Sequence, residues 1–170
     1  KAINDLNNDG FLDIITTNMS PNRLCIYYGN NSANYSSSVT YTLTGLPSSI
    51  NIVDINKDSI KDIVFTSRFA ASGANGTMKG NVNNSFDVPI YFSADGDIVS
   101  ISDFSGDSNE DLLIKKGLVT TLKLGDGNGL FTGNISIIPS TYVTNFFVLD
   151  LNNDGKLDLL ANESVSNTGK

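Results

Sequence analysis

Hydrophobic residues occur in short runs along the whole chain, and Gly, Asn, Ser or Asp closes each run. The runs are four to seven residues long and rich in Ile, Val, Thr, Phe and Tyr, which is the composition of β-strands. Many are apolar on successive residues, as is typical of strands that are buried on both faces. No segment has a helical period, so the pattern predicts an all-β protein.

An acidic motif occurs four times and divides the chain into repeats. The copies are DLNNDGFLD at 5–13, DINKDSIKD at 54–62, DFSGDSNED at 103–111 and DLNNDGKLD at 150–158. Their starts lie 49, 49 and 47 residues apart. A second landmark, a Gly followed six residues later by an aromatic residue, keeps the same phase. Its copies are Gly29 with Tyr35, Gly80 with Phe86, and Gly125 with Phe131.

Each repeat contains four short strands, one leading into the acidic motif and three after it. Four antiparallel strands in about 48 residues, buried on both faces, are typical of a β-propeller blade. We therefore expect residues 1–170 to be a segment of one propeller domain, with about three and a half blades. The blade repeats lie near 5–53, 54–102, 103–149 and 150–170.

A propeller ring generally needs four or more blades to close. The favoured interpretation is a ring of seven or eight blades, completed by further blades of the same chain. Completion by a second copy is the less favoured alternative.

Within a blade the acidic motif is the turn between the first two strands. The loops at 18–22, 67–76 and 92–97 then fall on the opposite face, where a partner would dock.

The acidic motif places oxygen-bearing side chains at positions 1, 3, 5 and 9, and the carbonyl of position 7 adds another oxygen. Oxygen ligands without nitrogen or sulfur favour Ca²⁺ or Mg²⁺, and five protein ligands with water suit Ca²⁺ better. We expect up to four calcium ions, one in each loop. The predicted ligands are Asp5, Asn7, Asp9, Phe11 (carbonyl) and Asp13; Asp54, Asn56, Asp58, Ile60 (carbonyl) and Asp62; Asp103, Ser105, Asp107, Asn109 (carbonyl) and Asp111; and Asp150, Asn152, Asp154, Lys156 (carbonyl) and Asp158.

The loop begins like an EF-hand but has strands on both sides and no Glu at position 12. Gly10 and Gly155 at position 6 allow a sharp turn, whereas Ser59 and Ser108 take this place in the middle loops. We expect the second and third loops to bind more weakly. Three carboxylates in one loop repel one another, so at least one pKa in each loop should rise, and a bound ion should stabilise the fold.

Charge and composition exclude several other functions. The net charge of −7 argues against binding to nucleic acid or anionic membranes, and no apolar run approaches the ~20 residues of a membrane span. There is no His, so the usual general base and zinc ligand are missing. The single cysteine, Cys25, is most simply a buried apolar residue. No catalytic residue is predicted.

The four acidic loops and the GDGNGLF-type turns resemble the FG-GAP/VCBS repeats, the family that includes the propeller of integrin α subunits. The chain has no Phe-Gly or Gly-Ala-Pro motif, so it is more similar to the microbial VCBS-like branch. The resemblance implies a calcium-bearing, secreted or cell-surface propeller used for adhesion, for protein or carbohydrate binding, or as an accessory module of secreted enzymes.

Two functions follow from this resemblance. The first is a non-catalytic adhesion or ligand-binding module for an extracellular protein or glycan. The alternative is the propeller portion of a secreted carbohydrate-active enzyme such as a polysaccharide lyase, with loop acids such as Asp95 and Asp97 in catalysis. Acids that flank a Gly are more often turn residues, which favours the first function.

Overall fold

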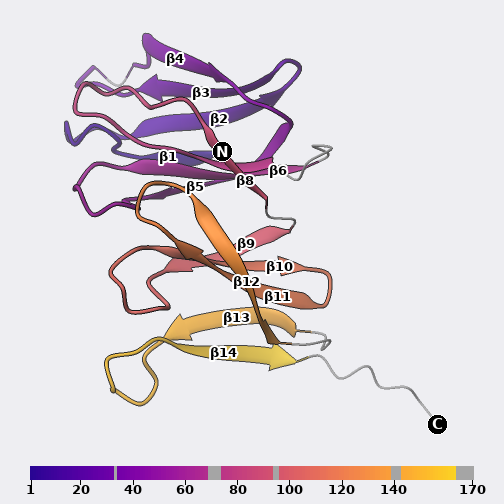
Figure 1. Ribbon diagram of the computed structural model, residues 1–170. Coiled ribbons are helices and arrows are strands. Elements are labelled where there is room, and N and C mark those ends of the chain that lie inside the picture. The colour runs from indigo at the N-terminus through magenta and orange to yellow at the C-terminus, as the bar shows by residue number, and fades with distance from the viewer. Residues whose placement is uncertain (33, 69–73, 94–95, 139–142, 164–170) are drawn as a thin grey trace. The chain divides into compact units, whose positions relative to one another are not determined.

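A computed structural model gives the arrangement of the strands (Figure 1). It describes residues 1–32, 34–68, 74–93, 96–138 and 143–163. Every regular element in these ranges is a β-strand, so the prediction of an all-β protein is confirmed. The same ranges contain no helix long and apolar enough to cross a membrane.

The chain divides into two compact units. The first comprises residues 1–95 with 127–130 and holds two antiparallel sheets, each with its strands in chain order. One sheet consists of β1 (Ala2–Asn4), β2 (Asp13–Met19), β3 (Asn22–Tyr28) and β4 (Ser37–Thr42). The other consists of β5 (Leu46–Val53), β6 (Asp62–Arg68), β7 (Ala74–Met78) and β8 (Ile90–Ser93).

The second unit comprises residues 96–126 with 131–170. It holds a four-stranded sheet of β9 (Asp97–Ser102), β10 (Asp111–Lys116), β11 (Val119–Gly125) and β12 (Phe131–Ile138). It also holds a two-stranded sheet of β13 (Val143–Leu149) and β14 (Asp158–Glu163). Three repeats thus form the predicted four-stranded blade, and the fourth contributes two strands.

The loops on the face opposite the acidic motifs are shorter than predicted. In the first sheet, pairing continues through polar residues as far as Met19 and Asn22, so only residues 20–21 connect β2 and β3. In the second, β6 extends to Arg68 and β7 begins at Ala74, because strand pairing does not require apolar side chains. Residues 69–73 and 94–95, which include part of the predicted docking surface, lie outside the described residues.

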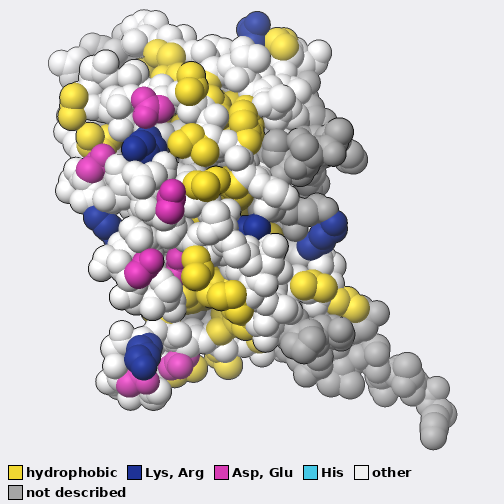
Figure 2. Space-filling view, viewed as in Figure 1, with side chains coloured by type: hydrophobic (Ala, Val, Ile, Leu, Met, Phe, Trp, Pro, Cys, Tyr) yellow, Lys and Arg dark blue, Asp and Glu magenta, His cyan; other side chains and the backbone are white. Residues whose placement is uncertain are grey.

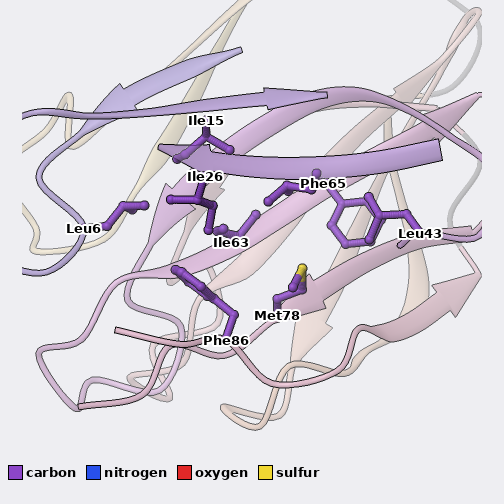
Figure 3. Packing of buried hydrophobic residues seen from close by; sticks show 9 residues of the cluster. Leu6, Ile15, Ile26, Leu43, Ile63, Phe65, Met78 and Phe86 are labelled. Carbon is purple, nitrogen blue, oxygen red and sulfur yellow. The ribbon is translucent and has the colours of Figure 1, made fainter. Parts of the chain in front are cut away.

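The core of the first unit lies between its two sheets (Figure 3). Alternate residues of a strand point to opposite faces of a sheet. On β3, Leu24 and Ile26 are therefore fully buried, while Tyr27 is partly exposed. The second sheet contributes Phe65 and other residues to the same cluster. Its full membership is Leu6, Ile15, Leu24, Ile26, Leu43, Ile63, Phe65, Met78 and Phe86.

Two tyrosines of the first sheet also hold the turn that precedes β8. The Tyr28 hydroxyl donates a hydrogen bond to the carbonyl of Asn84, and the Phe86 N–H donates to the Tyr41 hydroxyl at 2.8 Å. The rings of Tyr41 and Phe86 pack edge to face, with centroids 6.2 Å apart. The two sheets of this unit are thus joined by both apolar packing and hydrogen bonds.

Candidate metal-binding loops

Each acidic motif forms the loop between the first two strands of its sheet, as predicted. Position 6 has a positive φ in all four loops: Gly10 (88°), Ser59 (69°), Ser108 (74°) and Gly155 (81°). The two serines therefore adopt the left-handed backbone that glycine adopts at least cost. The second and third loops therefore carry backbone strain at this position that the first and fourth loops avoid.

Position 4 is also left-handed, which the sequence did not lead us to predict. Its residues are Asn8 (56°), Lys57 (59°), Gly106 (79°) and Asn153 (59°). Asn and Gly are common in the left-handed conformation, so the residue type indicates it in three of the four loops. Lys57 gives no such indication. Each loop thus has two left-handed residues, at positions 4 and 6.

The side chains at positions 1, 3 and 5 come together in the first loop. The Asp9 N–H donates to both Asp5 Oδ1 (3.1 Å) and Asn7 Oδ1 (3.2 Å), so these two oxygens lie beside the same nitrogen. The Asn7 amide donates to Asp9 Oδ2 at 2.9 Å, which brings the third side chain to the same place. The second Asp5 oxygen accepts the N–H of Gly10 at 2.9 Å.

The second loop repeats this arrangement. The Asp58 N–H donates to Asp54 Oδ1 at 3.1 Å and to Asn56 Oδ1 at 3.3 Å, and the Asn56 amide donates to Asp58 Oδ2 at 2.9 Å. The Asp54 carboxylate also accepts the N–H of Ser59 at 2.8 Å. A Ser at position 6 thus leaves the arrangement of positions 1, 3 and 5 unchanged.

The fourth loop matches the first two. The Asp154 N–H donates to Asp150 Oδ1 at 3.1 Å and to Asn152 Oδ1 at 2.9 Å. In Figure 2, acidic side chains lie at the surface beside a basic one over this loop, which joins β13 and β14. The loop is therefore open to solvent and to ions.

The third loop has Ser at position 3. The Ser105 hydroxyl lies 3.5 Å from Asp103 Oδ1, and the Asp107 N–H donates to the same oxygen at 3.2 Å. The position 1 carboxylate thus accepts both the hydroxyl of position 3 and the amide of position 5 in this loop. Ser105 supplies a hydroxyl oxygen where the other loops supply an amide carbonyl.

Position 7 was predicted to supply a carbonyl oxygen. In each loop its N–H donates to the position 5 carboxylate, at 2.8 to 2.9 Å, which fixes the end of the turn. These residues are Phe11, Ile60, Asn109 and Lys156. The carbonyl ligand stays a prediction.

Position 9 differs from the other acidic positions because it is buried. Asp13, Asp62 and Asp111 are fully buried at the start of the second strand of their sheets. Each accepts the N–H of position 2 through one oxygen and the N–H of the landmark Gly through the other. Asp158 is only half-buried and accepts the N–H of Leu151 at 2.9 Å.

Burial and neighbouring charges act together on two of the buried carboxyls. Burial is the main cause of the raised pKa of Asp13, and the charges of Asp9 and Asp5 raise it further, while backbone hydrogen bonds oppose the rise. The pKa of Asp62 is raised in the same way, with Asp58 and Asp54 as the neighbouring charges. The rise was predicted from repulsion, but desolvation is the larger cause.

The exposed third loop behaves differently. The pKa of Asp107 is lowered, chiefly because the backbone N–H of Asn109 donates to its carboxylate. Asp107 is therefore not the acid of this loop whose pKa was predicted to rise. Local hydrogen bonds therefore outweigh the opposing effect of desolvation at this exposed acid.

The donor set fits a hard cation, although the carboxylates mostly face N–H groups. Within the described residues, no three side chains of the Asp, Glu, Cys or His type are arranged together to hold a metal ion. A carboxylate oxygen has two lone pairs, so one that accepts an N–H keeps another for an ion. The chemical type of the ligands, all oxygen, matches the preference of Ca²⁺.

The remaining predicted residues lie apart from the loops. Asp97 is exposed at the start of β9, and its predicted companion Asp95 lies outside the described residues. Cys25 is half-buried, less than predicted, and the Thr40 hydroxyl donates to its Sγ at 3.6 Å. Cys25 lies on β3, away from the acidic loop of its sheet.

A protein-family model matches the first part of the chain. Residues 5–65 match the family model described as FG-GAP-like repeat, and this range includes the first two acidic loops. The comparisons with curated proteins and with solved structures found no match. With its blade-like sheets and repeated acidic loops, the chain carries an FG-GAP-like repeat over residues 5–65, in agreement with the FG-GAP/VCBS repeat family.

Proposed function

We propose that this protein is an extracellular calcium-binding propeller module without catalytic activity. The observation that carries the proposal is the convergence of side-chain oxygens from positions 1 and 3 on the amide of position 5, repeated in the first, second and fourth loops. In the third loop the position 1 carboxylate accepts this amide. The same three positions, with the carbonyl of position 7 and the aspartate of position 9, would hold the ion. A bound Ca²⁺ would neutralise the repulsion between the carboxylates and hold the two strands that the loop joins.

Its role as an adhesion or ligand-binding module for an extracellular protein or glycan rests on the FG-GAP-like repeat and on the absence of a predicted catalytic group. Secretion or cell-surface location follows from the metal, because loops of this kind need the ~0.1–1 mM Ca²⁺ found outside cells. The excess of acidic residues supports a partner that is neither nucleic acid nor an anionic membrane.

Further blades of the same protein would complete the ring, with a second copy as the less favoured alternative. This proposal is supported by apolar side chains on the terminal sheets. On β13 and β14, Phe147 is 58% exposed and Leu160 is 49% exposed, and on β1 Ile3 is 61% exposed. Blade faces of this composition are covered where the first unit packs its two sheets together.

Calorimetric titration of chelator-treated protein with Ca²⁺ tests the metal proposal, and Mg²⁺ is the comparison. We expect saturable binding of up to four Ca²⁺ ions, with weaker binding of Mg²⁺ because it demands a stricter octahedron. A flat Ca²⁺ titration would contradict the proposal. Protein and glycan arrays, run beside a polysaccharide degradation assay, test the binding role, and degradation without binding would favour the enzyme alternative.

A further inference from the structure

The aspartate at position 9 and the landmark Gly are joined in three repeats by the same hydrogen bond. We propose that this aspartate is a positioning residue, a clasp that ties the acidic loop to the glycine turn of its own sheet whether or not an ion is bound. The inference does not rest on the proposed function, because every contact that supports it lies between protein atoms.

The clasp has two halves, one for each carboxylate oxygen. In the first sheet, Asp13 Oδ2 accepts the N–H of Leu6 at 2.9 Å, and Asp13 Oδ1 accepts the N–H of Gly29 at 2.9 Å. Leu6 lies in the acidic loop, and Gly29 follows directly after β3. The carboxylate therefore spans from the loop between the first two strands to the turn between the last two.

The second and third sheets have the same clasp. Asp62 accepts the N–H of Ile55 and of Gly80, both at 2.8 Å. Asp111 Oδ2 accepts the N–H groups of Phe104 (3.0 Å) and Ser105 (2.9 Å), and its Oδ1 accepts that of Gly125 (2.9 Å). One contact recurring in three repeats of different sequence indicates a built feature of the fold.

The clasp also explains why the landmark residue is glycine. A Cβ at Gly29 would lie 2.4 Å from the carbonyl oxygen of Leu12, the residue just before the clasping aspartate. At Gly80 and Gly125 the corresponding distances, to the carbonyl oxygens of Lys61 and Glu110, are 2.3 and 2.1 Å. Only a residue without a side chain brings its N–H this close to the carboxylate.

Burial separates the clasp from the other acids of the loop. Asp13 and Asp62 are fully buried, whereas Asp9 and Asp58 at position 5 are exposed. A carboxylate withdrawn from water is costly unless N–H groups satisfy it, and here both oxygens are satisfied. Its first role is therefore to hold the backbone, and any contact with an ion is additional.

The clasp holds the acidic loop and the glycine turn side by side. In the first sheet the two segments line a pocket with a volume of about 240 Å³. Its lining residues are Gly10, Phe11, Leu12, Gly29, Asn30 and Tyr35. A change that opens the clasp should therefore disturb both sides of this pocket.

Amide hydrogen exchange of the unaltered protein in excess chelator tests the clasp directly. We expect the N–H groups of Gly29, Gly80 and Gly125 to exchange at least about tenfold more slowly than the exposed amide of Ser32, which donates to the neighbouring Asn30 side chain. Glycine amides that exchange as fast as that of Ser32 in chelator would overturn the proposal.

Two matched variants separate the clasp from metal binding. Asp13→Asn keeps the shape but turns one acceptor into a donor that faces an N–H, so we expect faster exchange at Gly29 and a lower melting temperature in chelator. Asp9→Asn alters an exposed loop acid, and we expect weaker Ca²⁺ binding with unchanged Gly29 exchange in chelator. If Asp13→Asn changes only Ca²⁺ affinity, the aspartate is a ligand and no clasp. Should that variant fail to fold, exchange in the unaltered protein still decides the question.

Discussion

Replacing Phe65 with alanine removes the largest fully buried side chain of the core. Its ring lies between the two sheets of the first unit and packs edge to face on Tyr91, with centroids 6.0 Å apart. The space around it is tight, since a Cβ at Gly76 would come within 2.5 Å of the ring. The neighbouring strands are fixed by backbone pairing and cannot collapse into the space that the ring leaves.

Loss of a buried phenylalanine costs about 3–5 kcal/mol of unfolding free energy, and this rigid site favours the upper half of that range. Such a loss is a large share of the roughly 5–15 kcal/mol by which domains are stable. With a urea slope of about 2 kcal/mol/M, the unfolding midpoint should fall by about 2–2.5 M, measured by far-ultraviolet circular dichroism.

Val82→Ala is the control, because the Val82 side chain is 91% exposed between β7 and β8. We expect this variant to stay within about 0.5 kcal/mol of the unaltered protein. A loss below about 1 kcal/mol for Phe65→Ala, or equal losses for the two variants, would refute the packing of the two sheets through Phe65.

Four further predictions follow from individual contacts. Gly80→Ala should destabilise by about 1–3 kcal/mol in urea unfolding, because its Cβ would lie 2.3 Å from the carbonyl oxygen of Lys61; an unchanged midpoint would contradict that contact. Burial is the main cause that raises the pKa of Tyr28 to about 12 from an ordinary value near 10, so stability that is present below pH 10 should be lost as pH rises through 12. An ultraviolet titration should show one late tyrosine that is missing in Tyr28→Phe. Asp154→Asn should weaken Ca²⁺ binding to one site about tenfold or more in calorimetry, and unchanged affinity would remove Asp154 from the ligands. Excess chelator should lower the melting temperature, because an ion at 100 times its Kd adds about 2.7 kcal/mol per site; an unchanged melt would count against metal binding.

The strands and the acidic loops could be predicted because their signals are local. Runs of β-forming residues end at Asx-rich turns, and the phase of the acidic motif places it between the first two strands of each sheet. The left-handed residue at position 6 was also predictable from Gly10 and Gly155. These features depend on residues that are close together in the chain.

The role of position 9 could not be read from the sequence because its partner is distant. Asp13 and Gly29 are 16 residues apart, and nothing local distinguishes a ligand from a buried acceptor of N–H groups. The landmark Gly recurs at a similar distance after the acidic motif in the first three repeats, which was the only indication of a contact between them. The contact itself forms because β2 and β3 pair and bring the two residues together. The short loops opposite the acidic motifs were missed because polar residues such as Asn18 and Asn22 continue the strand pairing.

The most direct measurement is a crystal structure of the protein grown in calcium, with difference density inspected in the four acidic loops. We predict a strong peak in the first and fourth loops, with side-chain oxygens of positions 1, 3 and 5 at about 2.3–2.6 Å from it. Density that shows these loops without an ion at millimolar Ca²⁺ would contradict the claim that calcium holds the strands of each blade together.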